Sequence, residues 1–286
     1  MSGTASFVWE WEWEAPLGIA LILLELGYVA VWVGSGMRRR CTRRAWALLA
    51  AFTGGLGAIV FALMSPIGAN DERLLSMHMI EHDLLIWIVA PLLLMGALPL
   101  LQSVRPRRAP SRPLAIITHP ALAWAISTVV LWAWHAPPLY GLALTNPIVH
   151  GVEHLWFVGG YLLYWWPLLA PPAAVGRLHS NVARVGYLLA GATQSALLGA
   201  VIMFRGSVIY SQYLHIPGAT LSSALADQRL AGALMWFPGA VVFALAAALA
   251  IREGDTQSQE ADADAAPGSV KCMPPGGPSV RVSNTM

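Results

Sequence analysis

The sequence predicts an all-α integral membrane protein, a bundle of seven transmembrane helices with its N-terminus outside and its C-terminus in the cytoplasm. The first observation is compositional: of 286 residues, 57% are hydrophobic and 11% are charged, and the mean hydropathy is +0.59. Soluble domains carry about a quarter charged residues. The second observation is that the apolar residues form blocks of about 20, enough to cross a bilayer. The third is that arginines gather in a few connecting segments.

Each apolar block is expected to be helical, because lipid offers no partner for an unpaired backbone group. In chain order the predicted spans cover residues 16–34, 45–65, 75–101, 119–134, 149–167, 184–203 and 224–250. They define a transmembrane domain over residues 16–252, preceded by an extracytoplasmic segment, 1–15. The tail, residues 253–286, is rich in Asp, Gly, Pro and Ser, and we expect it to be disordered in the cytoplasm.

Arginine placement predicts the orientation of the spans. The segment that follows the first span, GMRRRCTRR, carries five arginines, and SVRPRRAPSR after the third span carries four. Short basic loops stay on the cytoplasmic side of a membrane. The chain begins instead with the acidic run WEWEWE. The N-terminus is therefore expected outside, in a multi-pass plasma-membrane protein.

Two matching motifs open the third and fifth predicted spans. The first is His78-Met-Ile-Glu81-His82, and the second is His150-Gly-Val-Glu153-His154. Residues i, i+3 and i+4 share one face of a helix, so each motif directs two imidazoles and a carboxylate into one arc. Counting inward at about 1.5 Å per residue puts His82 and His154 at a similar depth, roughly 8–10 Å below the outer surface.

A metal site is one explanation of this polar layer, and a hydrogen-bonded cluster that joins helices is the other. Imidazole is the commonest protein ligand for copper, zinc, iron and nickel. A metal-bound His usually donates its second N–H to a carboxylate, and thioethers favour Cu(I). The predicted ligands are His78, His82, His150 and His154. The predicted supporting residues are Glu81, Asp83, Glu153, Asp227, Met79, Met235 and His135.

The chain resembles the CtaG family of cytochrome c oxidase assembly factors from about Glu25 to Ile251. The resemblance rests on three motifs in the family's order: His78–His82 followed by APLLLMGALP, His150–His154 followed by YWWP, and DQRLAGALMWFPG from Asp227. The family often has Gln where this chain has Glu81.

The resemblance implies a bacterial plasma-membrane protein that matures haem–copper oxidase by delivering or staging copper. Its implied partners are oxidase subunits, the lipid bilayer and a copper donor protein, and it implies no enzymatic activity. The net charge of +2 gives no indication of nucleic acid, and none is expected as a partner.

Three other functions fit the same residues. His-x-x-Glu-His is also an inverted zincin motif, in which Glu81 would be the general base of an intramembrane zinc hydrolase. Histidines from two spans could instead be axial ligands of a haem. A metal-free scaffold for oxidase subunits is the third alternative. Ligand type alone leaves copper, zinc and haem open as the cofactor, because imidazole suits all three.

Overall fold

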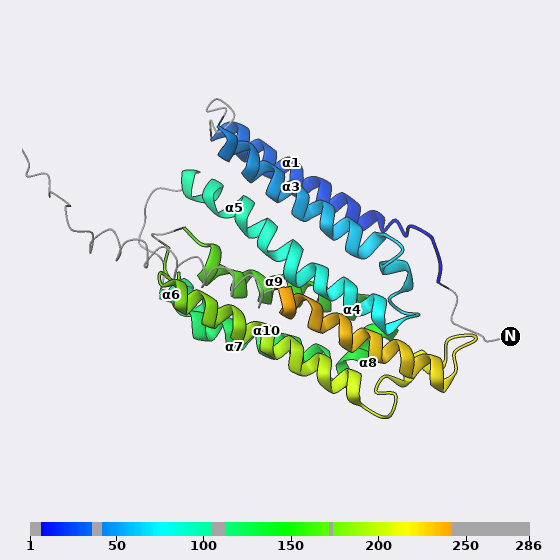
Figure 1. Cartoon of the computed structure of the whole chain (residues 1–286). Helices are drawn as coiled ribbons and strands as arrows, with labels where there is room; N and C mark the ends of the chain where they lie inside the picture. The colour runs from blue at the N-terminus through cyan, green and yellow to red at the C-terminus, as the bar shows by residue number, and fades with distance from the viewer. Residues whose placement is uncertain (1–6, 36–41, 105–111, 172–173, 242–286) are drawn as a thin grey trace, which may run out of the picture. The chain divides into compact units, whose positions relative to one another are not determined.

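The computed structural model describes residues 7–35, 42–104, 112–171 and 174–241, and every regular element within these ranges is helical (Figure 1). A helix covers the described part of each predicted apolar stretch. The predicted tail, 253–286, and the end of the last predicted span lie outside the described residues.

The first two long helices form an antiparallel pair. Helix α1, Ala15–Gly34, exposes a run of apolar side chains and buries Tyr28 and Trp32. Helix α3, Arg43–Met64, begins where the side chain of Thr42 accepts a hydrogen bond from the Ala45 amide. The exposed apolar face of α1 is unfavourable in water but suits lipid, since hydrocarbon is the natural neighbour of such side chains.

The third long segment is a helix with one π-helical turn inside it. It follows the short turn η1, Gly68–Asn70, and runs through α4, Leu75–Leu84, η2, Leu85–Val89, and α5, Ala90–Val104. Helix α5 packs closely on α3. A Cβ at Gly96 would lie 2.6 Å from the Phe52 Cβ, so only glycine permits this approach.

The middle of the chain adds four helices. These are α6, Arg112–Ile117, α7, Pro120–Trp134, α8, Pro137–Thr145, and α9, Pro147–Leu169. Proline occupies the start of α7, α8 and α9, where its missing N–H costs no helical hydrogen bond. Helix α8 was not predicted from the sequence, because its nine residues are too short to form a membrane span.

The last described part contains α10, Asn181–Phe204, the turn η3, Ser211–Leu214, and a helix over residues 221–241. Helix α10 and this last helix meet through glycines. A Cβ at Gly199 would lie 2.6 Å from the Gly232 carbonyl oxygen. Small residues at such crossings let helix backbones approach, which is how helices commonly associate in membranes.

Four described helical segments are long and apolar enough to cross a membrane: Ala15–Gly34, Arg43–Asn70, Leu75–Leu98 and Asn181–Phe204. Helix α7 is apolar but shorter. These helices, with the exposed apolar face of α1, identify an all-helical membrane protein. Within the unit that ends at residue 246, α3 packs on α5, α5 on α9, and α9 on α7. The N-terminal ends of α4 and α9 meet the C-terminal end of α7, and the polar side chains gather there.

Candidate metal centre

The two His-x-x-Glu-His motifs face each other across the contact between α4 and α9. The Glu153 carboxylate reaches both histidines of the opposite motif, with Oε2 3.8 Å from His78 Nε2 and Oε1 3.5 Å from His82 Nε2. In the reverse direction, Glu81 Oε1 lies 2.9 Å from His154 Nε2. Each carboxylate therefore contacts at least one histidine of the opposite helix.

Donor atoms converge in two overlapping groups. In each group, one nitrogen or oxygen from every member lies within 4.8 Å of those of the others. The inner group is His78, His82 and Glu153, and the outer group is Asp71, His78, Glu81 and His150. His78 belongs to both, and its ring stacks on that of His150 with centroids 5.2 Å apart. His154 contacts the outer group through Glu81 and through the His150 ring.

The inner group is sealed from solvent, and its polar atoms lack hydrogen bonds. His78 and Glu153 are 0% exposed and His82 is 2% exposed. Both ring nitrogens of each histidine, and both oxygens of Glu153, have no hydrogen-bond partner. An unsatisfied buried polar atom costs about 1–3 kcal/mol, so this arrangement is unfavourable unless another group engages these atoms.

A bound cation fits this donor set. Two neutral imidazoles and one carboxylate provide nitrogen and oxygen ligands that suit copper or zinc. Three protein ligands leave a coordination position open, as in sites that exchange or activate what they bind. His150 and His154 are each 14% exposed by side chain, so the outer group connects the buried donors toward the surface.

His135 and Met79, which were predicted as supporting residues, lie beside this group. The His135 ring is 5.5 Å from that of His82, and its Nε2 is 3.3 Å from Met79 Sδ. Its Nδ1 lies 2.8 Å from the Leu131 carbonyl oxygen at the last turn of α7. Burial lowers the pKa of His135 to about 4, so the ring is neutral at pH 7.

Asp227, which was predicted as a supporting residue, contacts Ser76 rather than a histidine in the described contacts. It accepts hydrogen bonds from the amide and hydroxyl of Ser76 in the first turn of α4. Leu74, the residue before α4, supplies no side-chain cap, so Asp227 satisfies donors that the helix start leaves open. Asp227 thus fixes the helix that carries His78 and His82.

The other two predicted supporting residues are peripheral. Asp83 belongs to neither group of converging donors among the described residues. Met235 is buried in the apolar core, and its backbone carbonyl accepts a hydrogen bond from the hydroxyl of Ser195.

Gln228, next to Asp227, fixes the segment after α10. Its side chain accepts a hydrogen bond from the Ile209 amide and donates to the carbonyl oxygens of Ile202 and Ser207.

Asp71 and three tyrosines beside the donor groups were not predicted from the sequence. Burial, and then repulsion from Glu81, raises the pKa of Asp71 to about 9. The backbone carbonyl oxygen of Asp71 accepts a hydrogen bond from the Tyr213 hydroxyl. The Tyr213 hydroxyl oxygen lies 2.6 Å from the Tyr140 hydroxyl oxygen. Tyr210 donates to the His135 carbonyl. These residues come from loops, from η3 and from α8, so no helical periodicity connects them with the motifs.

The π-helical turn η2 begins three residues after His82. Such turns occur mostly as single insertions in helices, frequently beside functional sites. The Trp165 indole N–H donates to the Ile86 carbonyl within this turn. The turn therefore lies between the polar end of this helix and its apolar continuation, α5, and α9 supplies a partner for its backbone.

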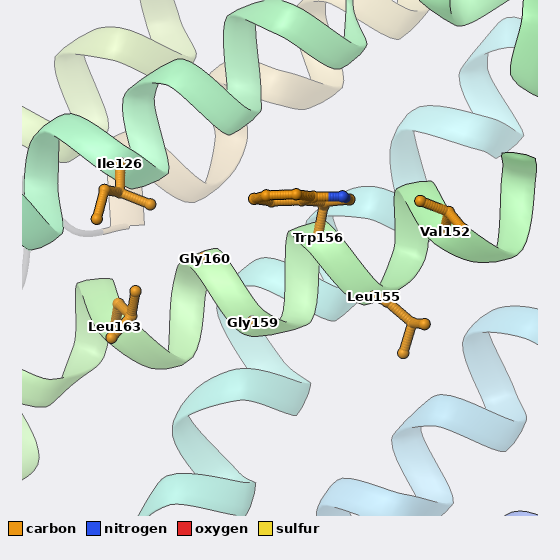
Figure 2. Close-up of a pocket in the computed structure, with 7 residues that line it drawn as sticks. All are labelled: Ile126, Val152, Leu155, Trp156, Gly159, Gly160 and Leu163. Atoms are coloured by element: carbon orange, nitrogen blue, oxygen red, sulfur yellow. The ribbon is translucent and has the colours of Figure 1, made fainter. Parts of the chain in front are cut away.

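A separate surface groove lies along α9, beside Ile126 of α7 (Figure 2). It has a volume of about 360 Å³ and is lined by Ile126, Val152, Leu155, Trp156, Gly159, Gly160 and Leu163. No titratable or metal-ligating side chain lines it, so it is unsuited to an ion. Its apolar lining is what a lipid-facing surface of α7 and α9 requires.

Comparison with known proteins adds one match. A family model described as cytochrome c oxidase caa3 assembly factor matches residues 26–253, which cover most of the chain and contain every group described above. Comparisons with curated proteins and with solved structures gave no match.

Proposed function

Because this chain belongs to the family of cytochrome c oxidase caa3 assembly factors, we propose that it serves oxidase maturation by holding a copper ion as cargo between α4 and α9. The observation that carries the proposal is the convergence of His78, His82 and Glu153 in a buried group whose nitrogens and oxygens have no other partner. Family membership supports a role in oxidase maturation, and the converging donor atoms support the binding of a metal ion.

Copper as cargo agrees with the composition of the site. The ligands are imidazoles with one carboxylate, and a thioether, Met79, lies beside them. Thioethers favour Cu(I) over zinc. The incomplete shell leaves room for an incoming ligand, so an ion could pass to a partner without complete dissociation. His150 and His154, which are less buried, provide intermediate positions toward the surface.

The proposal includes the predicted topology: seven spans, an external N-terminus and a cytoplasmic C-terminus in a bacterial plasma membrane. The arginine-rich segments GMRRRCTRR and SVRPRRAPSR support this orientation. The metal centre would then lie in the outer leaflet, close to the outer surface. Its partners would be an oxidase subunit that receives copper and a protein that donates it.

We propose a carrier rather than a zinc hydrolase. A hydrolase needs a general base beside a bound water. Here Glu81 approaches His154 of the other helix, and Glu153 lies among the metal donors. Both carboxylates are therefore engaged with histidines, and neither resembles a free base.

Complementation of a deletion strain tests this function. We expect wild-type protein to restore oxidase activity and oxidase copper content, and His82→Ala to restore neither. His179→Ala is the control, because this histidine is exposed and outside both donor groups. Full maturation with the His82→Ala variant at equal expression would overturn the proposal.

A further inference from the structure

The contact between His135 and Met79 is not an ordinary hydrogen bond. The Leu131 carbonyl oxygen can only accept, so the nearby Nδ1 of His135 carries the ring proton. In the neutral ring, Nε2 then bears a lone pair. This lone pair faces the Met79 sulfur at 3.3 Å, and sulfur also offers only lone pairs. The two atoms therefore face each other as electron-pair donors, with no proton to form a hydrogen bond between them.

The separation of these atoms suits a shared metal ion. Nitrogen and sulfur ligands bind metals at about 2.0 and about 2.3 Å, so a near-tetrahedral angle places them roughly 3.5 Å apart. The observed 3.3 Å is close to this value. Both side chains are buried, with Met79 0% and His135 4% exposed.

A third donor lies next to the pair. The His82 ring is 5.5 Å from that of His135, and neither of its nitrogens has a hydrogen-bond partner. His82 also belongs to the inner group with His78 and Glu153. His82 thus lies next to both the inner group and the His135 ring, whose Nε2 contacts the Met79 sulfur.

We propose that Met79 and His135, with His82, form a second coordination site that is selective for Cu(I). This second site rests on the proposed function, because it specifies the oxidation state of the copper cargo and a buried position that the ion would occupy. An ion would move between the carboxylate site and the thioether site by exchange around His82. Soft thioether ligation selects Cu(I), whereas Zn(II) remains with imidazole and carboxylate.

The tautomer is set by the fold. His135 follows the last residue of α7, and the Leu131 carbonyl oxygen, which accepts the His135 backbone N–H, also accepts Nδ1–H with its second lone pair. The Tyr210 hydroxyl donates to the His135 backbone carbonyl, which holds the residue in place. The backbone thus orients the lone pair of Nε2 toward Met79 before any ion binds.

The test compares Cu(I) and Zn(II) affinities of the full-length detergent-purified protein, by competition with chromophoric chelators under anaerobic conditions. We expect Met79→Leu to weaken Cu(I) binding by on the order of tenfold or more and to leave Zn(II) binding unchanged. This substitution nearly conserves volume, so the fold should persist. Met235→Leu is the matched control, because Met235 is also buried but lies among apolar groups.

X-ray absorption of the Cu(I)-loaded wild type keeps the test decisive even if Met79→Leu is unstable. We expect a copper–sulfur scattering shell, and a copper–selenium shell in selenomethionine-labelled protein. Copper bound with only nitrogen and oxygen neighbours would overturn this second site and leave the carrier function intact. A wild type that binds no copper would overturn both.

Discussion

Nε2 of His82 on α4 lies 3.5 Å from Oε1 of Glu153 on α9, and both side chains are buried. The other oxygen of the same carboxylate faces His78 at 3.8 Å. Lipid supplies little hydrophobic force between helices, so polar contacts have a larger share in their association. Here the polar contact consists of the proposed metal ligands, so the proposal couples the contact between α4 and α9 to ion binding.

The two carboxylates should differ in their effect on metal affinity. Glu153 lies in the inner group with two buried histidines, whereas Glu81 faces the less buried His154. We expect Glu153→Gln to weaken copper binding by roughly 10–100-fold, and Glu81→Gln to weaken it less. Chelator competition measures both. Equal losses would contradict the assignment of an inner site, and a peptidase activity abolished by Glu81→Gln with metal retained would indicate a hydrolase.

Asp227 should affect helix stability more than metal content. Asp227→Ala removes the acceptor for Ser76 at the start of α4, which should destabilise the protein by about 1 kcal/mol. Thermal unfolding in detergent measures this effect, and a cycle with Ser76→Ala should give a coupling of roughly 0.5–3 kcal/mol. We expect bound metal per chain to stay near the wild-type value. Loss of metal without loss of stability would show that Asp227 acts on the ion.

Replacement of Tyr140 and replacement of Tyr213 by Phe should lower the free energy of unfolding by different amounts. Tyr213 donates to the Asp71 carbonyl and therefore accepts from Tyr140. Tyr213→Phe leaves two buried groups without partners, whereas Tyr140→Phe removes only a donor. We expect a loss of about 1–3 kcal/mol for Tyr213→Phe and a smaller loss for Tyr140→Phe. A reversed order in thermal unfolding would contradict this donor assignment.

Close packing of α3 on α5 gives a test that is independent of the metal. In Gly96→Ala, the new Cβ would lie 2.6 Å from the Phe52 Cβ, and we expect destabilisation by about 1–3 kcal/mol. Gly57→Ala on α3 is the control, because no atom lies within 4 Å of its added Cβ. This control should be neutral or stabilising by up to about 1 kcal/mol. Similar unfolding temperatures for the two variants would contradict the packing.

Much of the helix layout could be predicted from sequence, because apolar blocks of membrane-spanning length have few alternatives to a helix. Helix α9 begins two residues before the predicted span and ends two after it. The membrane character and the family are confirmed, while the count of seven spans and the orientation stay predictions. The π turn was missed, because its residues, Leu85–Val89, read as ordinary apolar helix.

The repeated motif predicted which histidines and carboxylates could form a site, but whether the two motifs meet depends on how the helices pack, which the sequence does not show. The motif could not show that Glu153 serves His78 and His82 instead of its own neighbours, because that depends on how α4 and α9 pack. Asp71 lay outside any helical pattern. Asp227 was recognised as important, but its contact with Ser76 requires a helix from the far end of the chain.

The most direct test of a shared ion is the copper content of purified protein, measured by elemental analysis after Cu(II) loading and desalting, because the proposed thioether site would retain Cu(I) without Glu153. His82→Ala alters α4 alone, Glu153→Ala alters α9 alone, and exposed His179→Ala is the control. A shared site predicts that either change removes the same ion, and that combining them removes no more. If each variant lost a separate ion, or if both kept wild-type copper, α4 and α9 would not share a metal centre.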